Sequence, residues 1–306
     1  MISSEFWDYL IPGIALGALY AVIAIGYTLV YGVLQLINFA HSEVFMMGAF
    51  ASLLVLTGID ASHPSAAMSV LLVAVGMLAA ASAGAGTAFA LEKVAYRPLR
   101  RRNAPRLAFL ISAIGASFFL QNLAGKMFGH DSKSMPELFR NKKVFSVFGA
   151  QVTVLQLLIL GTAVAMMLAL DLLVNRTKMG AGIRAVAQDA ETASLMGVDI
   201  DRVVSRTFLV GGFMGGVAGF LFGMNSQVVF TMGFAPGITA FAAAVVGGIG
   251  NIRGAMIGGM LLGIVESFSS WQLGEEWRYV SAFAALVLVL MFRPTGILGE
   301  RLGRSA

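Results

Sequence analysis

A long uncharged stretch near the start of the chain limits what it can fold into. Residues 9–57 carry no charged side chain before His41 and Glu43. As one helix, this stretch would be about 74 Å long, more than twice the roughly 30 Å hydrocarbon core of a bilayer. It is therefore predicted to cross a membrane and fold back, and three residues mark the expected helix break: Gly32, Gln35 and Asn38.

The rest of the chain continues the apolar pattern. Only 12% of the 306 residues are charged, whereas soluble domains have roughly 25%. Nine passes are predicted, at 10–31, 39–57, 67–91, 107–125, 151–174, 203–225, 238–250, 254–272 and 278–292. The stretch 238–250 is short and is expected to be a re-entrant or broken helix. We therefore expect an all-α fold, a polytopic membrane helix bundle of about eight or nine transmembrane passes that forms one domain over residues 1–306.

Basic residues predict the orientation, because cytoplasmic loops carry an excess of Lys and Arg. Fifteen of the 21 lie in connections that nine passes place on one side: Lys93, Arg97, Arg100, Arg101, Arg102, Arg106, Arg176, Lys178, Arg184, Arg202, Arg206, Arg253, Arg293, Arg301 and Arg304. The loop 126–143, with five basic residues, is an exception on the other side. Trp7, Trp271 and Trp277 fall at the predicted outer interface, which amphipathic rings prefer. The N-terminus is predicted on the outer, periplasmic side of the membrane and the C-terminus in the cytoplasm.

Glycines recur at four-residue spacing in one predicted pass, at Gly211, Gly215, Gly219 and Gly223. Such a stripe lets two helix backbones approach closely in a membrane. The favoured interpretation is helix packing, and the alternative is a narrow path or a sliding interface.

One polar segment, residues 175–206, is predicted to stand outside the bilayer. Within it, Ile183 to Met196 is predicted to form a short amphipathic helix that ends at Gly197. Its polar face carries Arg184, Gln188, Glu191 and Ser194. A helix resting on the membrane surface would need larger apolar anchors than the small residues of the other face. The residues favour a docking helix for a partner protein.

Asn38, His41 and Glu43 cluster at the expected helix break. Polar groups inside a membrane are costly and often functional, and the freed backbone of a broken helix can line a cavity. We therefore predict that these three residues approach a substrate pathway. For Glu43, and for Glu266 in a later pass, a hydrogen-bonded structural role is an equal alternative.

Several kinds of chemistry lack their motifs. The chain has no cysteine, no G-x-x-x-x-G-K-[ST] phosphate loop, no H-E-x-x-H and no G-x-S-x-G. Its three histidines, His41, His63 and His130, lie far apart in the sequence. We expect no catalytic residues, no metal and no cofactor of its own. The formal net charge of +5 is explained by topology, so no nucleic-acid partner is expected.

Six motifs appear in a recognisable order. They are GYTLVYGVLQLINFAHSEVFMMGAF (26–50), EKVAYRPLR (92–100), LISAIGASFFLQN (110–122), MGAGIRAVAQDAETASLMGVDIDRV (179–203), FAAAVVGGIGNIRGAMIGGMLLGIVES (241–267) and RPTGILG (293–299). Over about residues 10–300 the chain resembles the LivH-type permease of bacterial branched-chain amino-acid ABC importers. It departs from that pattern at Ser42, where the family usually has glycine, and at Arg253, where it usually has proline.

The resemblance implies a subunit of the bacterial inner membrane that imports amino acids, with leucine, isoleucine and valine as the leading candidates. The implied partners are a second, LivM-like permease, two cytoplasmic ATPases that bind the ATP, and a periplasmic substrate-binding protein. The polar segment matches the family's ATPase-docking loop, and the positions carried over are Arg184, Gln188, Asp189, Glu191 and Leu195.

The alternative is a self-contained secondary transporter or channel for small polar solutes. The scarcity of buried carboxylates and the long polar segment argue against it. The sequence leaves the substrate open, since relatives of this family also handle other amino acids, urea, short amides or aromatic acids.

Overall fold

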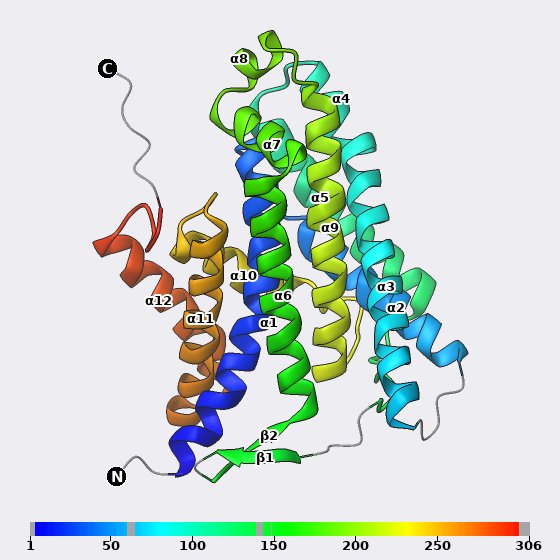
Figure 1. Ribbon diagram of the computed structural model, residues 1–306, viewed down its shortest axis with the longest axis vertical. Coiled ribbons are helices and arrows are strands. Elements are labelled where there is room, and N and C mark those ends of the chain that lie inside the picture. The colour runs from blue at the N-terminus through cyan, green and yellow to red at the C-terminus, as the bar shows by residue number, and fades with distance from the viewer. Residues whose placement is uncertain (1–3, 60–64, 139–142, 148, 300–306) are drawn as a thin grey trace. The chain divides into compact units, whose positions relative to one another are not determined.

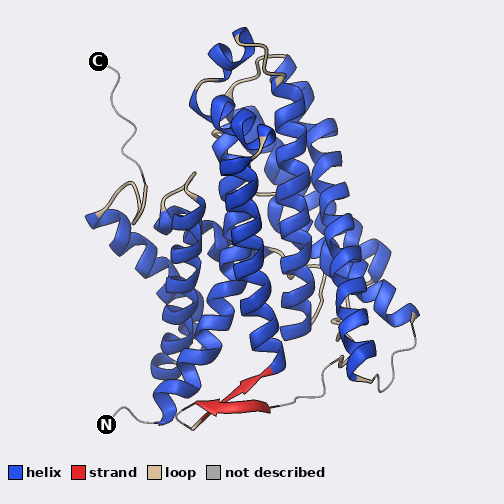
Figure 2. Cartoon of the chain, viewed as in Figure 1, coloured by secondary structure: helices blue, strands red, loops and turns tan. Residues whose placement is uncertain are grey.

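The chain is helical almost throughout in the computed structural model, which describes residues 4–59, 65–138, 143–147 and 149–299. Figure 1 shows its long helices, and Figure 2 shows a small hairpin in red. His63, in the loop after the second predicted pass, and the basic residues Arg140, Lys142, Arg301 and Arg304 lie outside the described residues.

Each of the nine predicted passes coincides with a helix: α1 (Ser4–Leu34), α2 (His41–Gly58), α3 (Ala66–Leu91), α5 (Arg106–Phe128), α6 (Val154–Arg176), α9 (Ile200–Asn225), α10 (Phe234–Gly247), α11 (Ile252–Leu273) and α12 (Arg278–Phe292). Seven of them are long and apolar enough to cross a membrane, by length and composition. The exceptions are α10 and α12, with 14 and 15 residues. The expected polytopic helical membrane fold is confirmed, with α10 short as predicted.

Two connections are more ordered than expected. The basic connection after α3 continues as a π-helical turn, η1 (Glu92–Tyr96), and then as α4 (Arg97–Arg101), so that residues 66–101 form one helix of 36 residues. The loop before α6 contains an antiparallel hairpin of β1 (Lys143–Val147) and β2 (Ala150–Thr153). The predicted start of the fifth pass at residue 151 was therefore wrong, because those residues pair as a strand and the helix begins at Val154.

The helices form two compact units. The first comprises Met1–Thr28, Lys143–Ala169 and Ile238–Ala306, and the second comprises Leu29–Lys142 and Leu170–Gly237. The first unit therefore contains most of α1 and α6 with α11 and α12. The second contains α2, α3, α5 and α9, together with the polar segment 175–206.

In the second unit, α2, α3 and α9 meet at glycines. A Cβ at Gly216 would collide with the carbonyl oxygen of Ala80 on α3, and a Cβ at Gly48 on α2 would lie 2.5 Å from the Cα of Gly216. A Cβ at Gly84 would collide with the carbonyl oxygen of Gly212. Lipid tails are as apolar as the helices, so close van der Waals packing of this kind drives association inside a membrane.

The predicted glycine stripe of α9 faces several neighbours. A Cβ at Gly219 would collide with the carbonyl oxygen of Phe45, and a Cβ at Gly223 would lie 2.5 Å from the terminal methyl carbon of Met135. Gly215 faces His41, and Gly211 is buried. The second pair, Gly212 and Gly216, was not singled out from the sequence.

The first unit uses the same packing between α1 and α11. A Cβ at Gly17 would lie 2.7 Å from the Cα of Met260, and one at Gly259 would lie 2.5 Å from the Cα of Ala21. At one end of this unit the ring of Tyr9 stacks on Trp271, with centroids 5.2 Å apart. Trp271, which the sequence predicts at the outer interface, therefore packs where the start of α1 meets the end of α11.

Glu266 of α11 is fully buried in the first unit, and its partners lie on two other helices. Tyr20 of α1 donates a hydrogen bond of 2.8 Å to its Oε2, and Arg278 of α12 donates one of 3.0 Å to the same atom. These contacts fit a hydrogen-bonded structural role for Glu266.

The glycine contacts of the second unit predict a contrast between two alanine substitutions. Gly216→Ala should destabilise the protein by roughly 1–3 kcal/mol, because the added methyl overpacks a backbone contact. Gly86→Ala in α3 is the matched control, since nothing lies within 4 Å of the added Cβ, and replacing glycine in a helix should be neutral or slightly stabilising. Thermal unfolding in detergent measures both, and equal melting temperatures for the two variants would contradict the packing.

Candidate functional site

The polar segment folds as two helices rather than one. The first is α7 (Lys178–Gln188), which is capped by the side chain of Thr177, and the second is α8 (Ala190–Leu195). The prediction of a single helix over Ile183 to Met196 was wrong, because Asp189 is extended, with a φ of −157°. The expected end is confirmed, since Gly197 follows α8 with a φ of +84°. We call residues 178–196 the docking segment, after the role predicted for it from the sequence.

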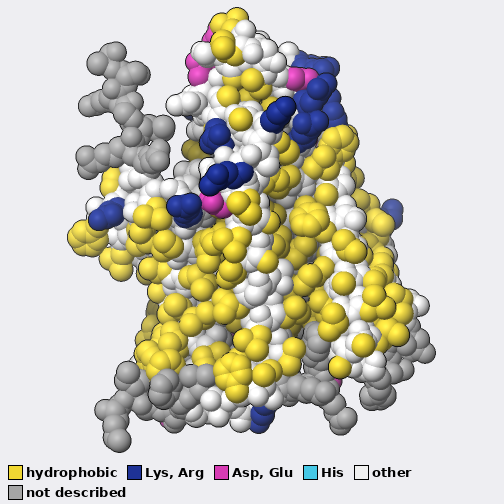
Figure 3. Space-filling view, in the orientation of Figure 1, with side chains coloured by type: hydrophobic (Ala, Val, Ile, Leu, Met, Phe, Trp, Pro, Cys, Tyr) yellow, Lys and Arg dark blue, Asp and Glu magenta, His cyan; other side chains and the backbone are white. Residues whose placement is uncertain are grey.

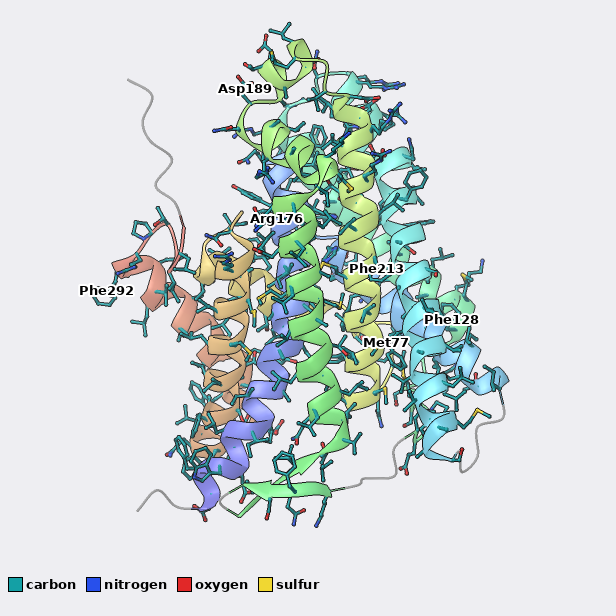
Figure 4. The ribbon with its side chains drawn as sticks, in the orientation of Figure 1. Met77, Phe128, Arg176, Asp189, Phe213 and Phe292 are labelled. Atoms are coloured by element: carbon teal, nitrogen blue, oxygen red, sulfur yellow. The ribbon has the colours of Figure 1, made fainter. Side chains whose placement is uncertain are left out.

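Asp189 produces the break between the two helices. Its Oδ1 accepts hydrogen bonds from the backbone N–H groups of Glu191, at 3.0 Å, and Thr192, at 3.2 Å, and so caps α8. Aspartate competes with the helical backbone in this way and is favoured at such caps. Hydrogen bonds from Thr192 lower the pKa of Asp189, so the cap stays ionised at neutral pH. Figure 4 labels Asp189 between the two helices.

The first helix of the docking segment packs on the second unit. Ile183 and Val186 are buried, and a Cβ at Gly180 would collide with the carbonyl oxygen of Val174 at the end of α6. The Nη1 of Arg184 donates a hydrogen bond to that same carbonyl oxygen. Arg184, predicted on the docking face, is therefore engaged with its own bundle.

The end of α7, the cap residue Asp189 and α8 together carry an exposed surface that is available to a partner. Gln188, Asp189 and Glu191 are exposed. Leu195 and Met196 are 84% and 81% exposed, although both are large and apolar. Four of the five residues predicted from the sequence for docking thus lie together on one exposed tip. Met196, which sequence reasoning left out, is the next residue along the chain.

The predicted helix break is confirmed between α1 and α2. The first helix ends at Leu34, Gln35 is left-handed with a φ of +53°, and α2 begins at His41. Of the three residues expected to mark the break, Gln35 and Asn38 lie in it, and Gly32 remains inside α1.

The three polar residues of the break share one buried turn but face different neighbours. Asn38 accepts a hydrogen bond of 2.6 Å from the hydroxyl of Tyr96. His41 faces Gly215, where a Cβ would lie 3.2 Å from its Cε1. Glu43 accepts a hydrogen bond of 3.1 Å from Ser117. The side chains therefore diverge toward η1, α9 and α5 rather than converging on one point.

Glu43 has one oxygen available for a further interaction. It is 1% exposed, and its Oε1 accepts the bonds from Ser117 and Ser42. Its Oε2 makes no hydrogen bond within the part of the chain that the structure describes, and it faces Gly233, where a Cβ would lie 3.1 Å away. Buried carboxylate oxygens normally have partners, so this atom marks a place where the turn can accept a proton, a water or a substrate group.

Comparison with known proteins identifies the family. The family model described as "Branched-chain amino acid transport system / permease component" matches residues 9–292. The chain belongs to this permease family. It is 43% identical to the high-affinity branched-chain amino acid transport system permease protein LivH of Salmonella typhimurium, covering 96% of each chain. It is 44% identical to LivH of Escherichia coli K12, again covering 96% of each chain.

A third relative is the high-affinity branched-chain amino acid transport system permease protein BraD of Pseudomonas aeruginosa. The chain is 42% identical to it, and the match covers 97% of this chain and 96% of the relative. The match to the permease family thus extends over both units.

The cap at Asp189 gives a prediction that is specific to this permease. Asp189→Ala should speed amide hydrogen exchange at Glu191 and Thr192, because their N–H groups lose the acceptor. Asp189→Asn is the matched control, since asparagine caps helices about as well. In the unaltered chain the protection should persist at neutral pH and be lost only at acid pH, because the hydrogen bonds from Thr192 lower the pKa of Asp189 and keep the cap ionised as the pH falls. Equal exchange in both variants would contradict the capping role.

Proposed function

We propose that the chain is the membrane permease subunit of an ABC importer that carries branched-chain amino acids, leucine, isoleucine and valine, across the bacterial inner membrane. The family match over residues 9–292 and the identities of 42–44% to LivH and BraD over nearly whole chains support this proposal. ATP hydrolysis takes place on separate subunits, and this chain binds no cofactor of its own.

The observation that carries the proposal is the exposed tip of the docking segment. Large apolar side chains that project from a polar surface mark sites of protein association, and Leu195 and Met196 project in this way beside Glu191. We propose that this tip inserts into a cleft on a cytoplasmic ATPase. Two such ATPases, a LivM-like second permease and a periplasmic binding protein complete the importer.

The orientation follows from the same end of the second unit. Figure 3 shows Lys and Arg side chains gathered near α4, at the end of this unit that also carries the docking segment. An excess of basic residues is typical of the cytoplasmic side. In the proposed orientation this end lies in the cytoplasm with the C-terminus, and the N-terminus lies in the periplasm.

In the proposed mechanism, the ATPases move the docking segment and the segment moves the helices on which it packs. ATP closes the ATPase pair and so moves the docking segment, and the bundle follows α7 because Ile183 and Val186 bury this helix against it. A partner can shift the bundle between outward and inward openings only by binding one state more tightly than the other. The tip of α8 supplies the contact surface, and α7 supplies the attachment.

Charge reversal tests the docking surface. Glu191→Lys should weaken retention of the ATPase subunits by roughly tenfold, which is about 1.4 kcal/mol, and should reduce amino-acid uptake while membrane insertion stays normal. Glu276→Lys, at an exposed glutamate before α12, is the matched control for retention. A pull-down of the ATPases from detergent measures both variants, and normal retention by Glu191→Lys would count against the docking assignment.

Cysteine substitution tests the proposed pathway, and the chain contains no cysteine of its own. Asn38→Cys and His41→Cys lie at sites that are 4% and 1% exposed. They should react with a polar thiol reagent from one aqueous side when ATP and the loaded binding protein drive the importer through its cycle. Ala113→Cys, buried in α5, should stay unreacted. Inertness of both test residues in every state would remove them from the pathway.

A further inference from the structure

Three arginines converge on one carboxylate at the start of α9, in the second unit. Asp201 accepts hydrogen bonds from the Nε atoms of Arg97, at 2.9 Å, Arg100, at 3.1 Å, and Arg101, at 3.2 Å. All three belong to α4, whereas Asp201 lies in the first turn of α9, six residues after Leu195 of the docking segment. The cluster therefore joins the helix that leaves the docking segment to the helix that extends α3.

A second carboxylate extends the cluster inward. The Nη2 of Arg100 donates a hydrogen bond of 2.9 Å to Glu92, whose side chain is fully buried. Ser205, one turn after Asp201 in α9, donates a hydrogen bond of 2.7 Å to the other oxygen of Glu92. A buried charge is costly unless it is paired and hydrogen-bonded. Separating α4 from the start of α9 would therefore leave Glu92 without its partners.

A single helical turn, η1, connects this charged cluster to the polar break between α1 and α2. Glu92 begins the π-helical turn η1, and Tyr96 ends it. The hydroxyl of Tyr96 donates the bond of 2.6 Å to Asn38, three residues before His41. Polar contacts thus join α9 to α4 and Glu92, the backbone of η1 connects Glu92 to Tyr96, and Tyr96 contacts the break between α1 and α2.

We propose that Asp201, Glu92 and Tyr96 are positioning residues that transmit movement of the docking segment to the polar break. This inference rests on the proposed function of the docking segment. The charged cluster makes α4 follow the start of α9, η1 takes up the displacement, and Tyr96 pulls or releases Asn38.

The π-helical turn η1 favours a transmitting role for the cluster, because neutralising the charges of Asp201 and Glu92 would not by itself need such a turn. A π turn has one residue too many for the α pattern, and such turns are rare and frequent at functional sites. Coupling between sites requires an element with two discrete arrangements. A turn that shifts between π and α hydrogen bonding is such an element, and it would rotate Tyr96 relative to the fixed glycine contacts of α3.

The test uses the whole importer in lipid vesicles, with its ATPases, second permease and binding protein. Tyr96→Phe removes only the hydroxyl, and Asp201→Asn removes the charge and replaces one of the two acceptor oxygens with an amide N–H donor. Each should lower the ATP hydrolysis stimulated by the binding protein, and the uptake per ATP, by about tenfold, a size typical of coupling between sites. Retention of the ATPases should not change. If Asp201→Asn fails to insert, Ser205→Ala takes its place.

The double variant decides whether the two residues act on one route. Tyr96→Phe with Asp201→Asn should lose about tenfold, as each single variant does, because a broken route cannot be broken again. Independent effects would multiply to about a hundredfold. Arg202→Gln is the matched control, because Arg202 pairs with Asp199 at 3.6 Å on the surface and both side chains are more than half exposed. It should behave as the unaltered chain, and Asp201→Glu should restore most of the coupling.

The outcomes separate the inference from the function beneath it. Unchanged stimulation in Tyr96→Phe and Asp201→Asn, or a hundredfold loss in the double variant, would overturn the transmitting role alone. Loss of ATPase retention in Asp201→Asn would also overturn it, since Asp201 would then act on docking. Failure of the unaltered chain to retain any ATPase would overturn the proposed function itself.

Discussion

Helix backbones touch without side chains between them where Gly216 of α9 meets Ala80 of α3 and Gly48 of α2. Water drives little of this association, because the alternative to a helix neighbour is lipid of the same polarity. Close packing of complementary helix surfaces therefore has to hold the bundle, and the contact at Gly216 holds α2, α3 and α9 together in the second unit. The same contact sets the position of α2, whose first turn carries His41 against Gly215. Polar groups at the break can be buried only because the helices around them are held this closely.

Buried carboxylates tie each unit together in a second way. Glu266 joins α1, α11 and α12 in the first unit, and Glu92 joins α4 and α9 in the second. Each has a cation and a hydroxyl as partners, so neither resembles a member of a proton relay. Two kinds of interaction therefore hold the helices together: buried ion pairs at Glu92 and Glu266, and close backbone contacts at glycines.

Much of the fold could be predicted, since apolar length and glycine spacing report directly on membrane helices. The short α10 and the break at Gln35 were within reach for that reason. The two helices of the docking segment were not, because Asp189 reads equally well as part of a polar helix face, and only its backbone reveals a cap. The contacts of Asn38, His41 and Glu43 were equally hidden. A cluster in sequence predicts a common turn, whereas the direction of each side chain depends on neighbours from three other helices.

Gln35 adds a consequence of its own. Its backbone is left-handed, and this conformation costs a residue with a Cβ roughly 1–2 kcal/mol. The side-chain amide of Gln35 compensates in part, because it donates a hydrogen bond of 3.2 Å to the carbonyl oxygen of Gly32. Glycine would hold the same bend at rest. A glutamine at this position leaves the bend strained. A rearrangement that straightens the chain between α1 and α2 would relieve this strain and is therefore favoured.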